Sequence, residues 1–144
     1  MTPSEGALRR WLAAVAVAGL AIALYLTVER AAGRAPACPI GGGCETVQSS
    51  RYAEIAGVPV AWLGLVAYAA LLVAALLPGL PGRALGLFVA TVGVGFSAWL
   101  TYAEVSLIHA LCAWCLASAA LMTIALVVTA LRAGAPEPAP SLSS

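Results

Sequence analysis

The sequence predicts an all-α integral membrane protein: a bundle of four transmembrane helices with a cysteine-bearing extracytoplasmic loop and a short surface helix. Hydrophobic residues make up 62% of the 144 residues and charged residues 9%, against about 45–50% and about 25% in soluble domains. The net charge of +1, with no basic cluster, excludes nucleic-acid binding. The apolar residues fall into four runs of about the length that crosses a bilayer, at about 11–28, 58–77, 84–103 and 108–131.

Residues 1–10 are predicted to be a short cytoplasmic N-terminus that ends in Arg9 and Arg10. The apolar run that follows, 11–28, is longer than the hydrophobic region of a cleaved signal peptide, which is about 7–15 residues. Three further apolar runs come after it. We therefore expect this run to be a retained transmembrane helix.

The polar segment 29–57 is predicted to be a loop that carries Cys38 and Cys44. Its prolines and the glycine triplet at 41–43 keep the first half from being helical. From 45 to 56 glycine and proline are absent. The spacing of the apolar residues there predicts a short amphipathic helix lying on the membrane surface.

The rest of the chain follows from similar patterns. Residues 78–83, rich in proline and glycine, are predicted to form a tight turn, and 104–107 a short connection in which Glu104 is expected to face water. Residues 132–144 are predicted to be a disordered tail. The third apolar run carries a stripe of small residues suited to close helix packing: Gly86, Ala90, Gly93 and Ser97.

Four transmembrane helices place both termini on one side of the membrane. The positive-inside rule favours cytoplasmic termini. The side of the termini carries four arginines, Arg9, Arg10, Arg83 and Arg132, and the loop on the other side carries three, Arg30, Arg34 and Arg51. The same orientation puts all four cysteines at the outer, oxidising face, where disulfides persist. We regard that coincidence as stronger evidence than the arginine count.

The motif Cys112-Ala113-Trp114-Cys115 lies near the start of the uncharged run 108–131. Residues three apart on a helix share a face, so the two sulfurs can close a disulfide or hold a metal. Cys112 is nearer the helix N-terminus, where the helix dipole favours a thiolate, and Cys115 lies one turn deeper. A dithiol in a membrane helix is well placed to pass electrons to a molecule dissolved in the bilayer.

Three motifs stand in a fixed order along the chain: the Cys38 to Cys44 spacing, the segment 44–59 with Gly64, and the stretch from Tyr102 through Cys112 and Cys115 to Ser118. Together with the four predicted helices, they resemble bacterial members of the vitamin K epoxide reductase family. The resemblance covers about residues 8–131.

The resemblance implies a four-helix bundle around a quinone, open toward the outer face of the bacterial inner (cytoplasmic) membrane. Cys112 and Cys115 are then the active-site pair, with Cys115 next to the quinone, and Cys38 and Cys44 the shuttle pair. Ser50 is expected near this site. The quinone is of the menaquinone, ubiquinone or vitamin K type, and no metal is implied.

Many bacterial members of this family carry a thioredoxin-like domain on the same chain. This sequence resembles the bare core, which implies a separate extracytoplasmic thioredoxin-like or DsbA-like partner. Vertebrate members have a tyrosine four positions after the second active-site cysteine, where this chain has Ala119. The difference favours quinone reduction over epoxide reduction.

Within this scheme we expect Cys44 to exchange with Cys112, and a Cys115 thiolate to react with the quinone. Ser50 either donates a hydrogen bond to a thiolate or a quinone oxygen, or caps a turn and faces water. Two tryptophans, Trp62 and Trp99, either line the quinone pocket or belong to an interfacial belt. His109 either stabilises a thiolate or ends its helix at the interface.

The residues therefore favour a membrane quinone-linked thiol oxidoreductase that supports disulfide-bond formation. Two alternatives stay open. One is a non-enzymatic membrane scaffold whose loop is stapled by Cys38 and Cys44. The other is a structural zinc site made of all four thiolates, although the five residues between Cys38 and Cys44 exceed the usual ligand spacing.

Overall fold

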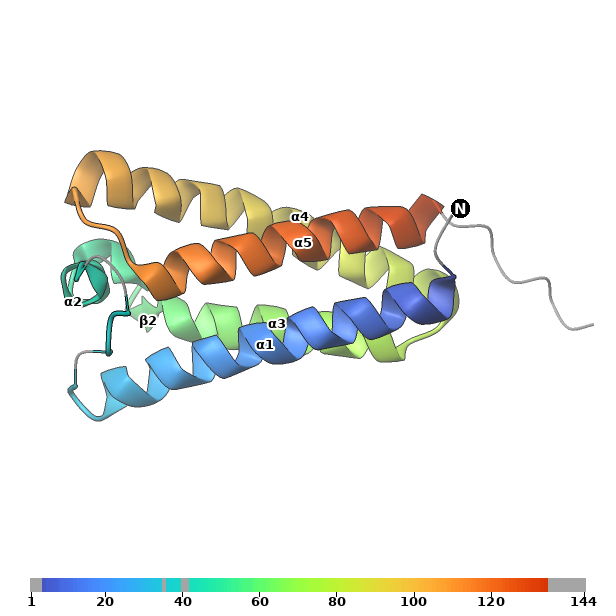
Figure 1. The fold of residues 1–144 in the computed structure, drawn as a ribbon, viewed down its shortest axis with the longest axis horizontal. Helices are drawn as coiled ribbons and strands as arrows, with labels where there is room; N and C mark the ends of the chain where they lie inside the picture. Colours follow the sequence, from blue (N-terminus) through green and yellow to red (C-terminus); the bar gives the residue numbers. More distant parts are fainter. Residues whose placement is uncertain (1–3, 35, 40–41, 135–144) are drawn as a thin grey trace, which may run out of the picture.

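A computed structural model describes residues 4–34, 36–39 and 42–134 of the chain. The long helices lie side by side along one axis, and the short elements gather at one end of this bundle (Figure 1). The beginning of the first helix and the end of the last lie together at the opposite end. In chain order the elements are α1 (Glu5–Ala31), α2 (Cys44–Gln48), the 3₁₀-helix η1 (Arg51–Ala53), β1 (Glu54–Ile55), β2 (Val58–Pro59), α3 (Val60–Leu76), α4 (Gly79–Tyr102), the π-helical η2 (Ala103–Ile108) and α5 (Ala113–Gly134).

The structure confirms the predicted helical fold, to which it adds a small β-hairpin. Three helical segments in the described part of the chain are long and apolar enough to cross a membrane: α1, α4 with η2, and α5. The fourth long helix, α3, has 17 residues, or about 26 Å at 1.5 Å per residue. Large apolar side chains cover the outside of the bundle, such as Val66 and Phe88. A surface of this kind is suited to lipid.

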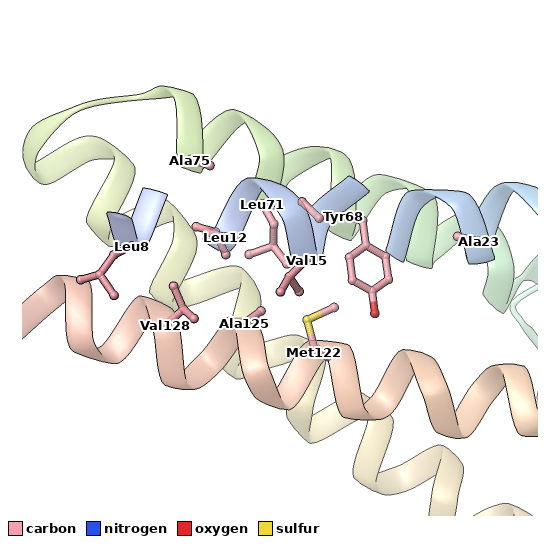
Figure 2. Packing of buried hydrophobic residues seen from close by; sticks show 12 residues of the cluster. Leu8, Leu12, Val15, Ala23, Tyr68, Leu71, Ala75, Met122, Ala125 and Val128 are labelled. Atoms are coloured by element: carbon pink, nitrogen blue, oxygen red, sulfur yellow. The ribbon is translucent and has the colours of Figure 1, made fainter. Parts of the chain in front are cut away.

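Buried apolar side chains from α1, α3 and α5 form the core, as Figure 2 shows. The stripe of small residues predicted on α4 lies against α5: Ala90 is fully buried, and a Cβ at Gly93 would lie 2.6 Å from the Met122 sulfur. On the other side, Gly19 of α1 receives the Tyr68 ring of α3 and leaves no room for a Cβ. Small residues thus let these helices approach closely.

Arginines at the end away from α2 hold the helices together. Arg132 is fully buried and donates hydrogen bonds to the carbonyls of Ala74, at 2.7 Å, and Leu77, at 2.6 Å. These carbonyls end α3 and have no partner within that helix. Glu5 pairs with Arg132 at 3.3 Å and with Arg83 at 3.1 Å. We call Glu5, Arg83 and Arg132 the arginine clasp.

The clasp accounts for two differences from the predicted boundaries. The first helix begins at Glu5, where Ser4 caps it by accepting the Ala7 N–H at 3.2 Å. The last helix continues to Gly134. Both ends are helical because Glu5 and Arg132 bind each other and the end of α3.

The prediction of one helix over 45–56 is wrong. Helix α2 ends at Gln48, and β1 and β2 form a small antiparallel hairpin after η1. The two residues at its turn, Ala56 and Gly57, both have positive φ, of 53° and 84°. Positive φ at both positions is the geometry of a type I′ turn, which a continuous helix cannot contain.

Candidate active site

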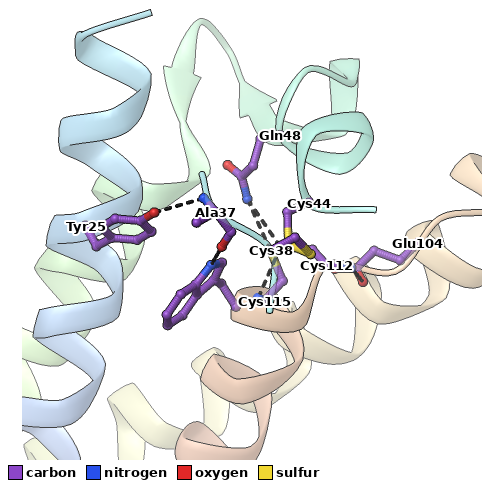
Figure 3. Close-up of a disulfide and its surroundings, with 9 residues drawn as sticks. Tyr25, Ala37, Cys38, Cys44, Gln48, Glu104, Cys112 and Cys115 are labelled. Carbon is purple, nitrogen blue, oxygen red and sulfur yellow. Dashed lines mark hydrogen bonds between the residues drawn. A yellow bond between two sulfur atoms is a disulfide. The ribbon is translucent and has the colours of Figure 1, made fainter. Parts of the chain in front are cut away.

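Cys38 and Cys44 are joined by a disulfide at the α2 end of the bundle, with Cα atoms 5.6 Å apart (Figure 3). Cys44 is the first residue of α2 and is fully buried, whereas Cys38 is half-buried. A reagent from outside therefore reaches the Cys38 sulfur more easily than the Cys44 sulfur.

Cys112 and Cys115 are free thiols at the beginning of α5. Cys112 is buried in the connection before the helix, and Cys115 is half-buried in the first turn. The Cys115 N–H donates a hydrogen bond to the Cys112 sulfur at 3.3 Å. The spacing of three residues thus places both sulfurs on one side of the helix start, as predicted.

The two cysteine pairs meet in one buried cluster. Cys44, Val47 and Cys112 form its centre, with Cys38 and Cys115 packed against it. Gly43 lets α2 approach this closely, because its Cα lies against the Leu111 backbone and a Cβ there would collide with it. The structure therefore brings together all four cysteines singled out in the sequence.

Gln48 is a polar residue of the site that the sequence analysis missed. Its side-chain amide donates to the Cys115 sulfur at 3.3 Å and to the Cys112 sulfur at 3.7 Å. The Arg30 guanidinium donates a hydrogen bond to the backbone carbonyl of Gln48 at 2.9 Å and so fixes the end of α2. A signal was present, because Gln48 lies four residues after Cys44 and shares its helix face.

Hydrogen bonding favours the thiolate of Cys112. The Cys115 thiol, the Cys115 N–H and the Gln48 amide all donate to this sulfur, and together they lower the pKa of Cys112 to about 7. Burial and the nearby Glu104 carboxylate act in the opposite direction. Cys112 can therefore be the nucleophile of a thiol–disulfide exchange near neutral pH.

The expectation that Glu104 faces water is wrong. Its side chain is only 2% exposed, and its Oε2 accepts the backbone N–H of Cys112 at 3.0 Å. Glu104 belongs to η2, and its side chain points toward Cys112 at the beginning of α5, as Figure 3 shows. His109 follows in the left-handed conformation, with φ of 57°, and is exposed.

A cavity of about 450 Å³ extends from the thiols into the bundle. Cys115 lies in its wall, together with a few polar side chains: Gln48, Tyr52, Tyr68, Ser97, Thr101, Glu104 and Ser118. The rest of the wall is apolar and comes mainly from α1, α3, α4 and α5. A concave, mostly apolar site with a few polar groups suits an apolar ring that carries polar oxygens.

The cavity also reaches the lipid-facing side of the bundle. Part of its wall consists of residues of α3 and α4 that are exposed on the outside: Leu63, Val66, Phe88 and Val92. The path to Cys115 therefore begins between α3 and α4.

Three residues predicted to contact a quinone lie elsewhere among the described residues. The Ser50 hydroxyl donates to the Val47 carbonyl at 2.7 Å. Trp62 is 56% exposed and Trp99 47% exposed. None of the three belongs to the cavity wall.

Within residues 4–34, 36–39 and 42–134, no group of three or more His, Cys, Asp or Glu side chains is placed to hold a metal ion. A zinc site made of four cysteines needs four thiolates. In this structure two of the sulfurs are joined in the Cys38–Cys44 disulfide.

A family model described as the vitamin K epoxide reductase family matches residues 10–130 of the chain. The matched range includes both cysteine pairs, Gln48 and Glu104. The family implies an oxidoreductase that works in a membrane with thiols and quinones. The chain therefore belongs to the vitamin K epoxide reductase family, as the resemblance predicts.

Proposed function

We propose that the protein oxidises a reduced thioredoxin-like protein and passes the electrons to a membrane quinone. One observation carries the proposal: Cys44 and Cys112 lie in the same buried cluster, and Cys115 lies in the wall of the apolar cavity. Packed cysteine side chains thus connect the half-exposed Cys38 with the cavity wall.

The first exchange takes place at the loop. A thiolate of the partner attacks Cys38, the more accessible sulfur, and releases Cys44 as a thiolate. The partner's second thiol then displaces Cys38. The partner leaves with a new disulfide, and the chain holds reduced Cys38 and Cys44.

The second exchange moves the electrons inward. The Cys44 thiolate attacks Cys112 in a Cys112–Cys115 disulfide and releases Cys115. Cys38 then displaces Cys112 from Cys44. The products are a Cys38–Cys44 disulfide and reduced Cys112 and Cys115, which is the arrangement of the structure.

The last step reduces the quinone. Formation of the Cys112–Cys115 disulfide releases two electrons and two protons, and the quinone takes both to become a quinol. Cys115 is the sulfur nearest the substrate, because it lies in the cavity wall. Of the residues predicted to contact the quinone, Ser50, Trp62 and Trp99 lie outside that wall, so we propose contacts from Gln48 and Ser118 instead.

We further propose four membrane crossings in the bacterial inner membrane, with cytoplasmic termini and the cysteines on the outer face. The arginines of the clasp, with Arg9 and Arg10 near the beginning of α1, lie at the end of the bundle where α1 begins and α5 ends, as the positive-inside rule favours for a cytoplasmic face. The two cysteine pairs lie at the other end.

Purified protein in lipid nanodiscs tests the proposal. We expect it to oxidise a reduced thioredoxin-like protein only when a quinone is added, and Cys115→Ala to abolish that turnover. Cys38→Ser should accumulate a Cys44–Cys112 mixed disulfide, seen by mass spectrometry after non-reducing digestion. Full turnover in Cys115→Ala, or a Cys38–Cys44 bridge that never opens during turnover, would instead favour a scaffold with a stapled loop.

A further inference from the structure

We infer that Glu104 is the proton carrier of quinone reduction: its carboxylate takes the proton of the Cys115 thiol and delivers it to the quinone in the cavity. This inference rests on the proposed function. Glu104 lies beside the reacting thiols, because its Oε2 accepts the backbone N–H of Cys112 at 3.0 Å. It also lines the same cavity as Cys115.

A structural role alone does not account for a carboxyl buried without a cation at the position of Glu104. The ion pairs among the described residues involve other acids, namely Glu5, Glu29 and Glu54. A buried carboxyl without a cation is unfavourable for folding, and such groups gather at functional sites. A carboxylate has about four lone-pair sites, of which the Cys112 N–H uses one.

The groups that face Glu104 are compatible with this role. Its titratable neighbours are the thiols of Cys112 and Cys115. The Glu104 Oε2 lies 3.0 Å from the backbone nitrogen of Cys112. Farther along the cavity wall lie Tyr52 from η1 and Tyr68 from α3, whose hydroxyl is bound to Ser118 at 2.8 Å. Helix α1 contributes only apolar residues to this wall, and α2 contributes Val47 and the neutral Gln48.

The proton balance assigns one of the two protons to Glu104. As the Cys115 proton passes to the carboxylate, Cys115 becomes a thiolate. The sulfur–sulfur bond to Cys112 forms, two electrons pass to the quinone, and Glu104 returns to a carboxylate by giving its proton to a quinone oxygen. Cys112 releases its own proton to water at the loop end, and water supplies the second proton of the quinol.

The test compares Glu104→Gln and Glu104→Asp with Glu45→Gln, which removes an exposed carboxylate on α2. Single-turnover quinone reduction is followed in pre-reduced protein from pH 5 to 9. We expect Glu104→Gln to slow this step by about 10²-fold or more, the usual contribution of general acid–base catalysis, and Glu104→Asp to restore most of the rate. Exchange of the partner with Cys38 and Cys44 should stay near the wild-type rate in all three variants.

The outcomes separate this inference from the function on which it rests. If the wild type does not reduce a quinone, the proposed function fails. If the wild type reduces it and Glu104→Gln matches its rate at every pH, Glu104 carries no proton. Equal losses in Glu104→Gln and Glu104→Asp, together with slower loop exchange, would show that Glu104 only positions Cys112. Should Glu104→Gln not fold, Glu104→Asp decides. A shift in the low-pH part of its profile of quinone-reduction rate against pH supports the inference, and an unchanged profile overturns it.

Discussion

Tyr25 of α1 and Trp114 of α5 bind the two backbone polar groups of the same residue, Ala37. The Tyr25 hydroxyl accepts the Ala37 N–H at 2.9 Å, and the Trp114 indole N–H donates to the Ala37 carbonyl at 2.6 Å. The two rings also contact each other, with centroids 5.2 Å apart. Because Ala37 directly precedes Cys38, these contacts fix where the loop disulfide meets the bundle (Figure 3).

Trp114→Phe should slow electron transfer from the loop to the inner thiols. Phenylalanine keeps an aromatic ring, although a smaller one, and lacks the indole N–H. A hydrogen bond of about 1 kcal/mol is lost, so we expect about a fivefold lower rate of exchange between the two cysteine pairs. Rapid acid quenching and thiol labelling measure that rate. Quinone reduction by protein pre-reduced with a small dithiol should stay unchanged. Trp11→Phe, at a 65% exposed position of α1, is the control, and equal rates in both variants would contradict the role of Trp114.

Gly43→Ala should separate the two cysteine pairs. A Cβ at this position collides with the Leu111 carbonyl and lies 2.8 Å from the Leu111 nitrogen, so α2 must move away from Cys112. We expect a severalfold loss of the trapped Cys44–Cys112 mixed disulfide in the Cys38→Ser background. Gly6→Ala adds a Cβ in open space and is the matched control. An unchanged yield in Gly43→Ala would show that the loop exchanges from another position.

The thiolate form of Cys112 should increase with pH around a midpoint near 7. The thiolate is the reactive form, and the pKa of Cys112 is lowered to about 7 by the Cys115 thiol first and also by the Cys115 N–H and Gln48. In Gln48→Ala and Cys115→Ala the midpoint should move up, toward the value of about 8.5 of an ordinary thiol. Because the Cys112 sulfur is buried, the ultraviolet absorbance of the thiolate measures this without a reagent that must reach it, and a midpoint above 8 in the wild type would contradict it.

Arg132→Ala should destabilise the bundle without changing the chemistry at its other end. The change leaves Glu5 and the carbonyls of Ala74 and Leu77 without this donor, and losing hydrogen bonds from a charged group costs about 1.5–3 kcal/mol. Thermal unfolding in detergent should show a much lower midpoint, whereas the exposed Arg10→Ala should match the wild type. An unchanged midpoint would mean that the clasp contributes little to stability.

The cysteine sites and the long helices were accessible from sequence, because their signals are local. Uninterrupted apolar runs predict helices, and the three-residue spacing of Cys112 and Cys115 places two sulfurs together. The burial of Glu104 was missed because the predicted helix ended at 103, so this residue was assigned to a connection. The helical segment instead continues as η2 to Ile108, and helical spacing places Glu104 on the same face as Ala90 and Gly93.

The arginine clasp and the anchoring of Ala37 were missed for a different reason. Arg132 binds carbonyls 55 and 58 residues away in sequence, and Trp114 binds one 77 residues away. A backbone carbonyl has the same chemistry at every residue, so no residue type marks it as a partner. Such contacts follow only from the packing of α1, α3 and α5.

In the proposed reaction, the opening of the cavity between α3 and α4 determines how the quinone reaches Cys115. Leu63, Val66, Phe88 and Val92 belong both to the cavity wall and to the lipid-facing surface. An electron acceptor that arrives by this path diffuses within the plane of the bilayer. Turnover then follows the mole fraction of quinone among the lipids, so diluting the membrane with inert phospholipid slows the reaction even when the quinone content of the sample is constant.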